Sequence, residues 1–106
     1  MTDAVILMTV PPEKRKEILQ TIKAILGAIR LERGCKSCNC YVDVESENVF
    51  YFLEEWGTAE DLNAHLESVH FHVLIGAMKL LKEEPTIIFK TIASTAGAEA
   101  IRQARS

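Results

Sequence analysis

The stretch VFYFLEEW, residues 49–56, decides the fold, because it predicts a strand that is apolar on both faces. Successive side chains of a strand point to opposite faces of the sheet. The large side chains therefore divide between the two faces: Phe50, Phe52 and Trp56 on one, and Val49, Tyr51 and Leu53 on the other. A sheet that is apolar on both faces has to be covered on both.

The residues that precede this strand predict a strand, a helix and a hairpin. Residues 4–10 form an apolar run of strand length. Pro12 suits the first turn of a helix, and the isoleucines after it recur at helical spacing until about Glu32. Residues 38–44 alternate in polarity, and the turn ESEN joins them to the strand at 49–56.

The residues that follow predict helical segments and one more strand. Thr58 and Ser68 are typical N-caps, Pro85 ends the second helical segment, and residues 86–93 form the last strand. The order β-α-β-β-α-β is the ferredoxin-like α+β arrangement. Its antiparallel four-stranded sheet carries the helices on one face only.

The first and last strands repeat the two-sided apolar pattern of residues 49–56. The last strand, for example, sets Ile88 and Ile92 against Ile87 and Phe89. Two helical segments can cover one face of such a sheet, and the simplest cover for the other is the sheet of a second copy. The sequence therefore predicts a homodimer whose sheets pack face to face as a dimeric α/β barrel.

Length and charge restrict the class of protein. A chain of 106 residues suits one domain, which we place at residues 1–93, followed by a C-terminal tail at residues 94–106. The net charge of −3 offers no basic face for nucleic acid. No apolar run reaches the ~18 residues that span a membrane. The N-terminus lacks the features of a signal peptide, so we expect a cytoplasmic protein without membrane or nucleic-acid partners.

Three cysteines cluster in GCKSCNC, residues 34–40. An odd, closely spaced set is not a disulfide framework. Cys35 and Cys38 make a single CxxC, and no second pair completes a zinc site. We expect Cys35, Cys38 and Cys40 to be reduced thiols without zinc.

Four stretches resemble the antibiotic biosynthesis monooxygenase domain family. They are GCKSCNCYVD, FYFLEEW, TAEDLNAHLESVHFHVL and EEPTIIFK, and the resemblance runs from about residue 4 to residue 93. It implies dimeric α+β barrels, some of which oxidise polycyclic or quinol-type aromatics without metal or flavin. Other members degrade haem or process small signalling sugars. The chain departs from the commonest pattern at Cys38, where an aromatic is frequent, and it lacks the first-strand asparagine of the haem-degrading branch.

All three histidines lie in NAHLESVHFHVL, residues 63–74, and their spacing does not suit a metal. Helical histidines that share a metal are three or four residues apart. His70 and His72 are two apart, and the Ser68 cap interrupts the helix between His65 and His70. We therefore expect no metal site.

His65 and His70 are candidate catalytic bases. His70 follows the Ser68 cap by two residues, where the positive end of a helix disfavours imidazolium. The alternative is structural, because each histidine could bind a carbonyl or a carboxylate and lock the two helical segments. His72 lies on the polar side of its helix, and we expect it to face solvent.

A small-molecule site would be apolar with a few polar groups. We expect Asn39, Tyr51, Trp56 and Phe71 to line it. The sequence carries no Gly-rich phosphate loop, so no cofactor is expected. The leading hypothesis is a cofactor-independent monooxygenase of a small quinol-type or polycyclic aromatic substrate. The alternatives are a non-catalytic dimeric ligand-binding module, and a haem-degrading or signal-sugar-processing member of the same family.

Overall fold

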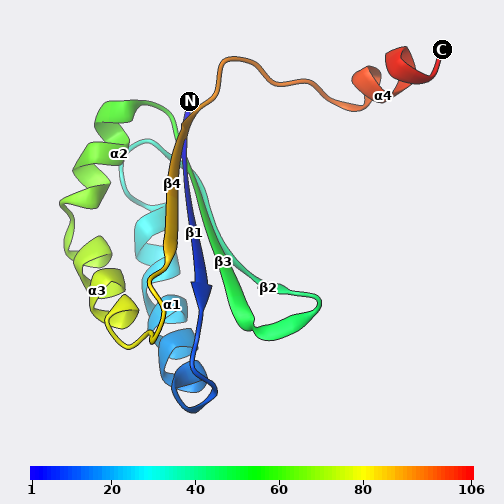
Figure 1. The fold of residues 1–106 in the computed structure, drawn as a ribbon. Coiled ribbons are helices and arrows are strands. Elements are labelled where there is room, and N and C mark those ends of the chain that lie inside the picture. Colours follow the sequence, from blue (N-terminus) through cyan, green and yellow to red (C-terminus); the bar gives the residue numbers. More distant parts are fainter.

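The computed structural model describes all 106 residues, and their order of elements confirms the predicted α+β, ferredoxin-like fold (Figure 1). The elements are β1 (Thr2–Thr9), a 3-10 turn (Pro12–Lys14), α1 (Arg15–Arg30), β2 (Cys35–Asp43), β3 (Ser46–Trp56), α2 (Ala59–Leu66), α3 (Val69–Met78), β4 (Thr86–Thr91) and α4 (Ala98–Arg105). No helix among them is both long enough and apolar enough to cross a membrane.

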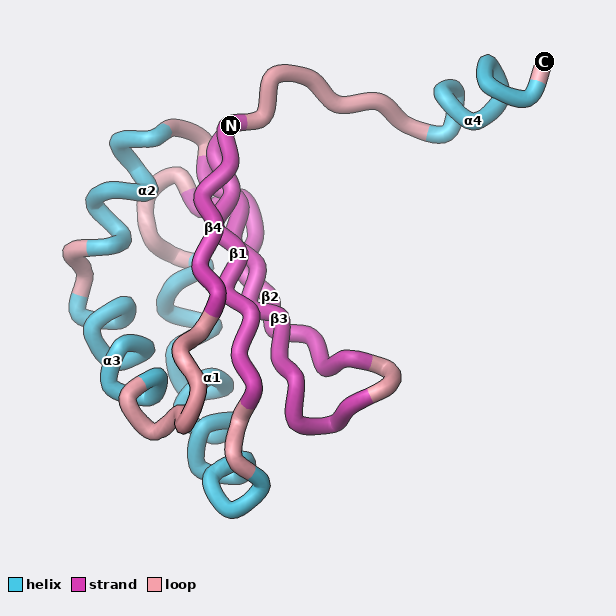
Figure 2. Tube along the Cα trace, viewed as in Figure 1, coloured by secondary structure: helices cyan, strands magenta, loops and turns pink.

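The strands form one antiparallel sheet in the order β2-β3-β1-β4. At the centre, Ile6 of β1 lies opposite Phe52 of β3 and Ile87 of β4. Helices α1, α2 and α3 cover one face of this sheet, which we call the helix side, and leave the other face open (Figures 1 and 2). Helix α4 stands away from the rest of the chain.

The core lies between the sheet and these helices, and the predicted alternation of β3 is confirmed. Burying one large apolar side chain stabilises the fold by about 1.5–3 kcal/mol. The buried apolar cluster consists of Ala4, Ile6, Met8, Val10, Ile18, Ile22, Ile25, Ile29, Cys38, Phe50, Phe52, Trp56, Leu62, Phe71 and Leu74.

The opposite face of the sheet carries apolar side chains that nothing in the chain covers. Val5, Leu7 and Tyr51 are half-buried, whereas Tyr41, Leu53 and Ile88 are exposed. We call these six residues the open face. Strand β4 is exposed on its helix side as well, at Ile87 and Phe89.

The chain differs from the sequence predictions at several ends of elements. Helix α1 ends at Arg30, and Gly34, with a φ of 80°, completes the turn into β2. Helix α3 ends at Met78 and does not continue to Pro85. Leu80 and Leu81, which follow the helix, pack against the core. The weakly helical tail forms the short, exposed helix α4.

Candidate functional site

One carboxylate, Glu54, lies inside the apolar core. The alternation of β3 places it on the helix side, between Phe52 and Trp56, where it is 1% exposed. A buried carboxylate is unstable without partners. The indole Nε1–H of Trp56 donates to Oε1 of Glu54 at 3.2 Å, and Nε2 of His65 lies 2.7 Å from Oε2. The second contact is a close ion pair.

His65 is buried in the last turn of α2 and is held on every side. Its Nδ1 lies 3.0 Å from Oε1 of Glu32, just beyond α1. Its ring stacks on Trp56, with 4.5 Å between ring centroids, and the edge of Phe71 meets it at 5.3 Å. The predicted residues His65, Trp56 and Phe71 therefore share one cluster, together with two glutamates.

The two glutamates favour the charged form of His65. Burial alone lowers the pKa of His65, but the contacts with Glu54 and Glu32 raise it by more, so the pKa lies above the ordinary histidine value. The imidazolium is thereby stabilised in the core.

Glu32 also binds the second candidate histidine. Its Oε2 lies 3.1 Å from Nδ1 of His70, so one carboxylate bridges α2 and α3. The Ser68 cap, whose Oγ accepts from the N–H of Phe71, sets where α3 begins and hence where His70 lies. The side chain of His70 is 34% exposed, and its Nε2 makes no hydrogen bond within the chain.

This arrangement suits proton transfer at the surface. A carboxylate that accepts the Nδ1–H of an imidazole fixes the tautomer in which Nε2 carries the free electron pair. His70 is the member of the cluster that offers such a nitrogen to solvent, whereas His65 has both nitrogens occupied by carboxylates. His72 is exposed, as predicted.

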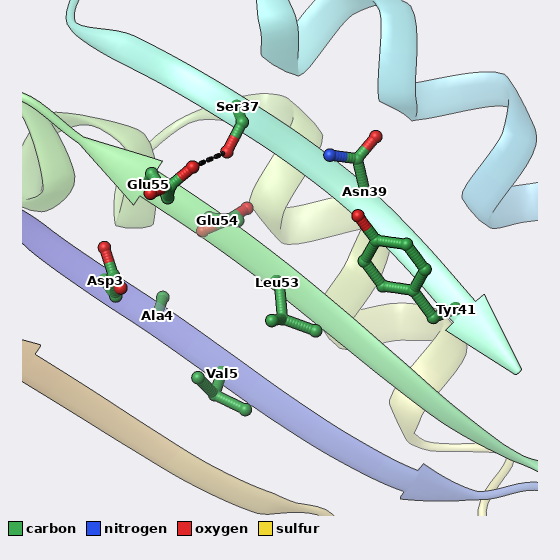
Figure 3. Close-up of a pocket in the computed structure, with 9 residues that line it drawn as sticks. All are labelled: Asp3, Ala4, Val5, Ser37, Asn39, Tyr41, Leu53, Glu54 and Glu55. Carbon is green, nitrogen blue, oxygen red and sulfur yellow. Dashed lines mark hydrogen bonds between the residues drawn. The ribbon is translucent and has the colours of Figure 1, made fainter. Parts of the chain in front are cut away.

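The other predicted binding residues lie on the opposite face of the sheet. Asn39 accepts from Arg30 Nη2 at 3.1 Å, and the hydroxyl of Tyr51 donates to Asp43 at 3.4 Å. Asn39 borders a hollow of about 240 Å³, which Tyr51 does not line. Figure 3 shows the lining of this hollow: Asp3, Ala4, Val5, Ser37, Asn39, Tyr41, Leu53, Glu54 and Glu55. The predicted residues therefore do not form one site.

Sequence reasoning missed both glutamates of the cluster. Glu54 had a readable signal, because it interrupts the apolar face formed by Phe52 and Trp56, and such a carboxylate requires a partner. Glu32 had none, since its contacts join residues more than 30 positions apart.

The cysteines are not activated as nucleophiles. All three are free, and Cys38 faces the core. Burial raises the pKa of Cys35 and of Cys38, and it raises the pKa of Cys40 to about 11. No three His, Cys, Asp or Glu side chains are grouped so as to hold a metal ion.

Comparisons with known proteins place most of the chain in one group. The sequence model described as antibiotic biosynthesis monooxygenase matches residues 1–76, which include Glu32, Glu54, His65 and His70. YcnE of Bacillus subtilis, by name a candidate monooxygenase, is 30% identical over 82 residues, 77% of this chain and 86% of YcnE.

Solved structures share the fold of this chain. A conserved protein from Methanosarcina mazei Go1 is 27% identical with a TM-score of 0.79, over 84% of this chain and 89% of that one. A candidate antibiotic biosynthesis monooxygenase from Deinococcus radiodurans is 20% identical with a TM-score of 0.84, over 92% of this chain and 97% of that one. The second likeness shows the fold alone.

Proposed function

Because the chain belongs to the antibiotic biosynthesis monooxygenase family, we propose that it oxidises a small quinol-type or polycyclic aromatic substrate with O₂, without metal or flavin. The observation that carries the proposal is the Glu32 carboxylate, which binds both histidines and leaves Nε2 of the half-buried His70 free.

In the proposed reaction His70 is the general base. Glu32 accepts its Nδ1–H, so Nε2 takes a proton from the substrate's hydroxyl or enol. The resulting anion gives one electron to O₂, and the substrate radical and superoxide combine through a new C–O bond into a peroxide. His70 returns its proton to the peroxide. The carbon that bears the peroxide then loses its C–H proton as the O–O bond breaks, so that a carbonyl forms and water leaves. One oxygen atom enters the product, the other leaves as water, and the substrate supplies all four electrons.

We assign His65 a positioning role. As an imidazolium between Glu54 and Glu32, it holds the Glu32 carboxylate toward His70. Trp56 and Phe71 fix the ring of His65 and close the apolar side of the cluster. Asn39 and Tyr51 lie across the sheet, and the proposed reaction uses neither.

We propose further that the protein is a homodimer in which the open faces of two copies pack together. The support is the set of exposed apolar residues, among them Tyr41, Leu53 and Ile88, on a face that no helix covers. Sheets stack face to face about 10 Å apart, which matches side chains of this size. Three free thiols in one strand suit the reducing cytoplasm, where we place the protein.

Oxygen uptake with a panel of quinols and polycyclic phenols tests the function. His70→Ala should lose about 10²–10⁴-fold in rate and keep its fold and oligomeric state. The matched control is His72→Ala, two residues along the same helix and exposed, which should keep full activity. Equal activity in both variants, or loss of turnover with a chelator, would contradict the assignment. Ligand binding without oxygen uptake would indicate the non-catalytic alternative.

A further inference from the structure

Two segments that lie far apart in the fold carry exposed apolar side chains beside charges of opposite sign (Figure 1). The first is α4, and the second is the tip of the β2–β3 hairpin, residues 42–47, which we call the hairpin tip. Figure 1 shows the hairpin tip at the far end of the sheet from the point where the tail leaves.

Helix α4 is amphipathic and has no partner in its own chain. Ala100, Ile101 and Ala104 lie on one side, and Ile101 is 63% exposed. Arg105, four residues after Ile101, lies next to it on the helix, and Arg102 lies further round, toward the opposite side. Helices shorter than about 12–15 residues are marginal in water, so an eight-residue helix with no buried residue needs something to pack against.

The hairpin tip is acidic and apolar. Val44 is 99% exposed and Val42 is 45% exposed. The hairpin tip also contains three acidic residues: Asp43 between the two valines, and Glu45 and Glu47 after them.

None of these charges is paired within the chain. The six ion pairs of the structure include neither arginine of α4 and no acid of the hairpin tip. Arg15, which approaches the hairpin, donates to the backbone carbonyl of Glu47 and not to its carboxylate.

The tail cannot bring α4 to its own hairpin tip. Strand β4 ends at Thr91, level with Thr2 and Trp56 in the sheet register. From Trp56 to the other end of β3 is about 33 Å at ~3.3 Å per residue. The seven extended steps from Thr91 to Ala98 and the first turn of α4 carry Ile101 at most about 30 Å, and Val44 lies beyond the end of β3.

We propose that α4 of each copy docks on the hairpin tip of a second copy, with Ile101 against Val44 and the two arginines among the three acids. The inference rests on the proposed homodimer. We place the two-fold axis of that dimer between the two sheets and perpendicular to the strands. Opposite ends of the two sheets then lie next to each other. Each hairpin tip then lies beside the end of the partner sheet from which the tail leaves, and the contact forms twice.

Disulfide cross-linking between differently tagged copies tests the contact. Ile101→Cys in one copy is mixed with Val44→Cys in the other, and the matched control replaces Val44→Cys by Val69→Cys. Val69 is likewise exposed but lies on α3 in the helix layer. Wild-type mixtures give the background of the three native cysteines. We expect a cross-linked heterodimer with position 44 and none above background with position 69.

Charge reversal gives a second measurement. The double variant Arg102→Glu/Arg105→Glu should raise the dimer dissociation constant about tenfold, and adding Glu45→Arg/Glu47→Arg should restore it. A dimer that lacks the 44–101 cross-link, or that cross-links equally at position 69, would contradict the docking of α4 but not the proposed homodimer. A monomer overturns both. Binding of α4 to anionic vesicles without the cross-link also overturns it and assigns the helix to a membrane surface.

Discussion

The imidazole of His65 stacks on the indole of Trp56, with 4.5 Å between ring centroids and 26° between ring planes. Trp56 also donates its Nε1–H to Glu54, and the same carboxylate pairs with Nε2 of His65. The three side chains form a closed polar unit inside an apolar core. Such a unit is stable only when each member is present, since removal of one leaves the others buried without a partner.

The first prediction concerns the pH dependence of stability. The folded pKa of His65 is raised, so its ion pairs contribute fully below the unfolded value of about 6.5 and are lost as pH rises through the folded pKa. His65→Gln should lower the free energy of unfolding by about 3 kcal/mol below that pH. The difference in free energy of unfolding between His65→Gln and the wild type should decrease at higher pH.

Urea unfolding at a fixed protein concentration, between pH 5.5 and 9, measures this gap. His72→Gln is the control and should track the wild type at every pH, because His72 is exposed. A gap for His65→Gln that stays constant across the range would mean that the ion pairs do not stabilise the fold.

The second prediction separates the two neighbouring glutamates of β3. Glu54 contacts His65 in the core, whereas Glu55 points to the opposite face and binds the hydroxyl of Ser37. Glu54→Gln keeps the shape but removes the charge that raises the pKa of His65. The pKa of His65, followed by NMR, should fall in Glu54→Gln and stay unchanged in Glu55→Gln. An unchanged value in both variants would refute the ion pair.

The third prediction concerns Glu32. In Glu32→Gln the amide can donate to Nδ1 of His70 as well as accept from it, so Nε2 no longer always carries the free electron pair and proton transfer to it should slow. We expect kcat to fall about 10²-fold with little change in KM, because in the proposed reaction Glu32 contacts the two histidines and not the substrate. Glu67→Gln, an exposed glutamate at the end of α2, is the matched control. A change confined to KM would instead place Glu32 in substrate binding.

The sequence predicted what local chemistry determines. The caps at Thr58 and Ser68 each accept the expected backbone hydrogen bond, and the faces of β3 follow from alternation alone. The bridge made by Glu32 was not predictable, because it depends on how α1 packs beside α2 and α3. The end of α3 at Met78 also depends on tertiary packing, because Leu80 and Leu81 pack against the core outside the helix. Pro85 shows only that the helix cannot extend past it.

The last prediction tests the open face by substitution at one exposed residue. Leu53 projects from β3 onto the open face and is 36% exposed, and Val73 of α3 is 40% exposed on the helix layer. If two open faces pack together, Leu53→Asp buries an unpaired carboxylate twice in each symmetric dimer, and each burial costs several kcal/mol. The dimer dissociation constant should then rise by about a thousandfold or more. Val73→Asp should leave the dissociation constant unchanged, because that position stays in water.

Sedimentation measures the dissociation constants of both variants, with circular dichroism to establish that each variant is folded. A Leu53→Asp protein that remains dimeric at micromolar concentration would show that the copies do not meet through this face.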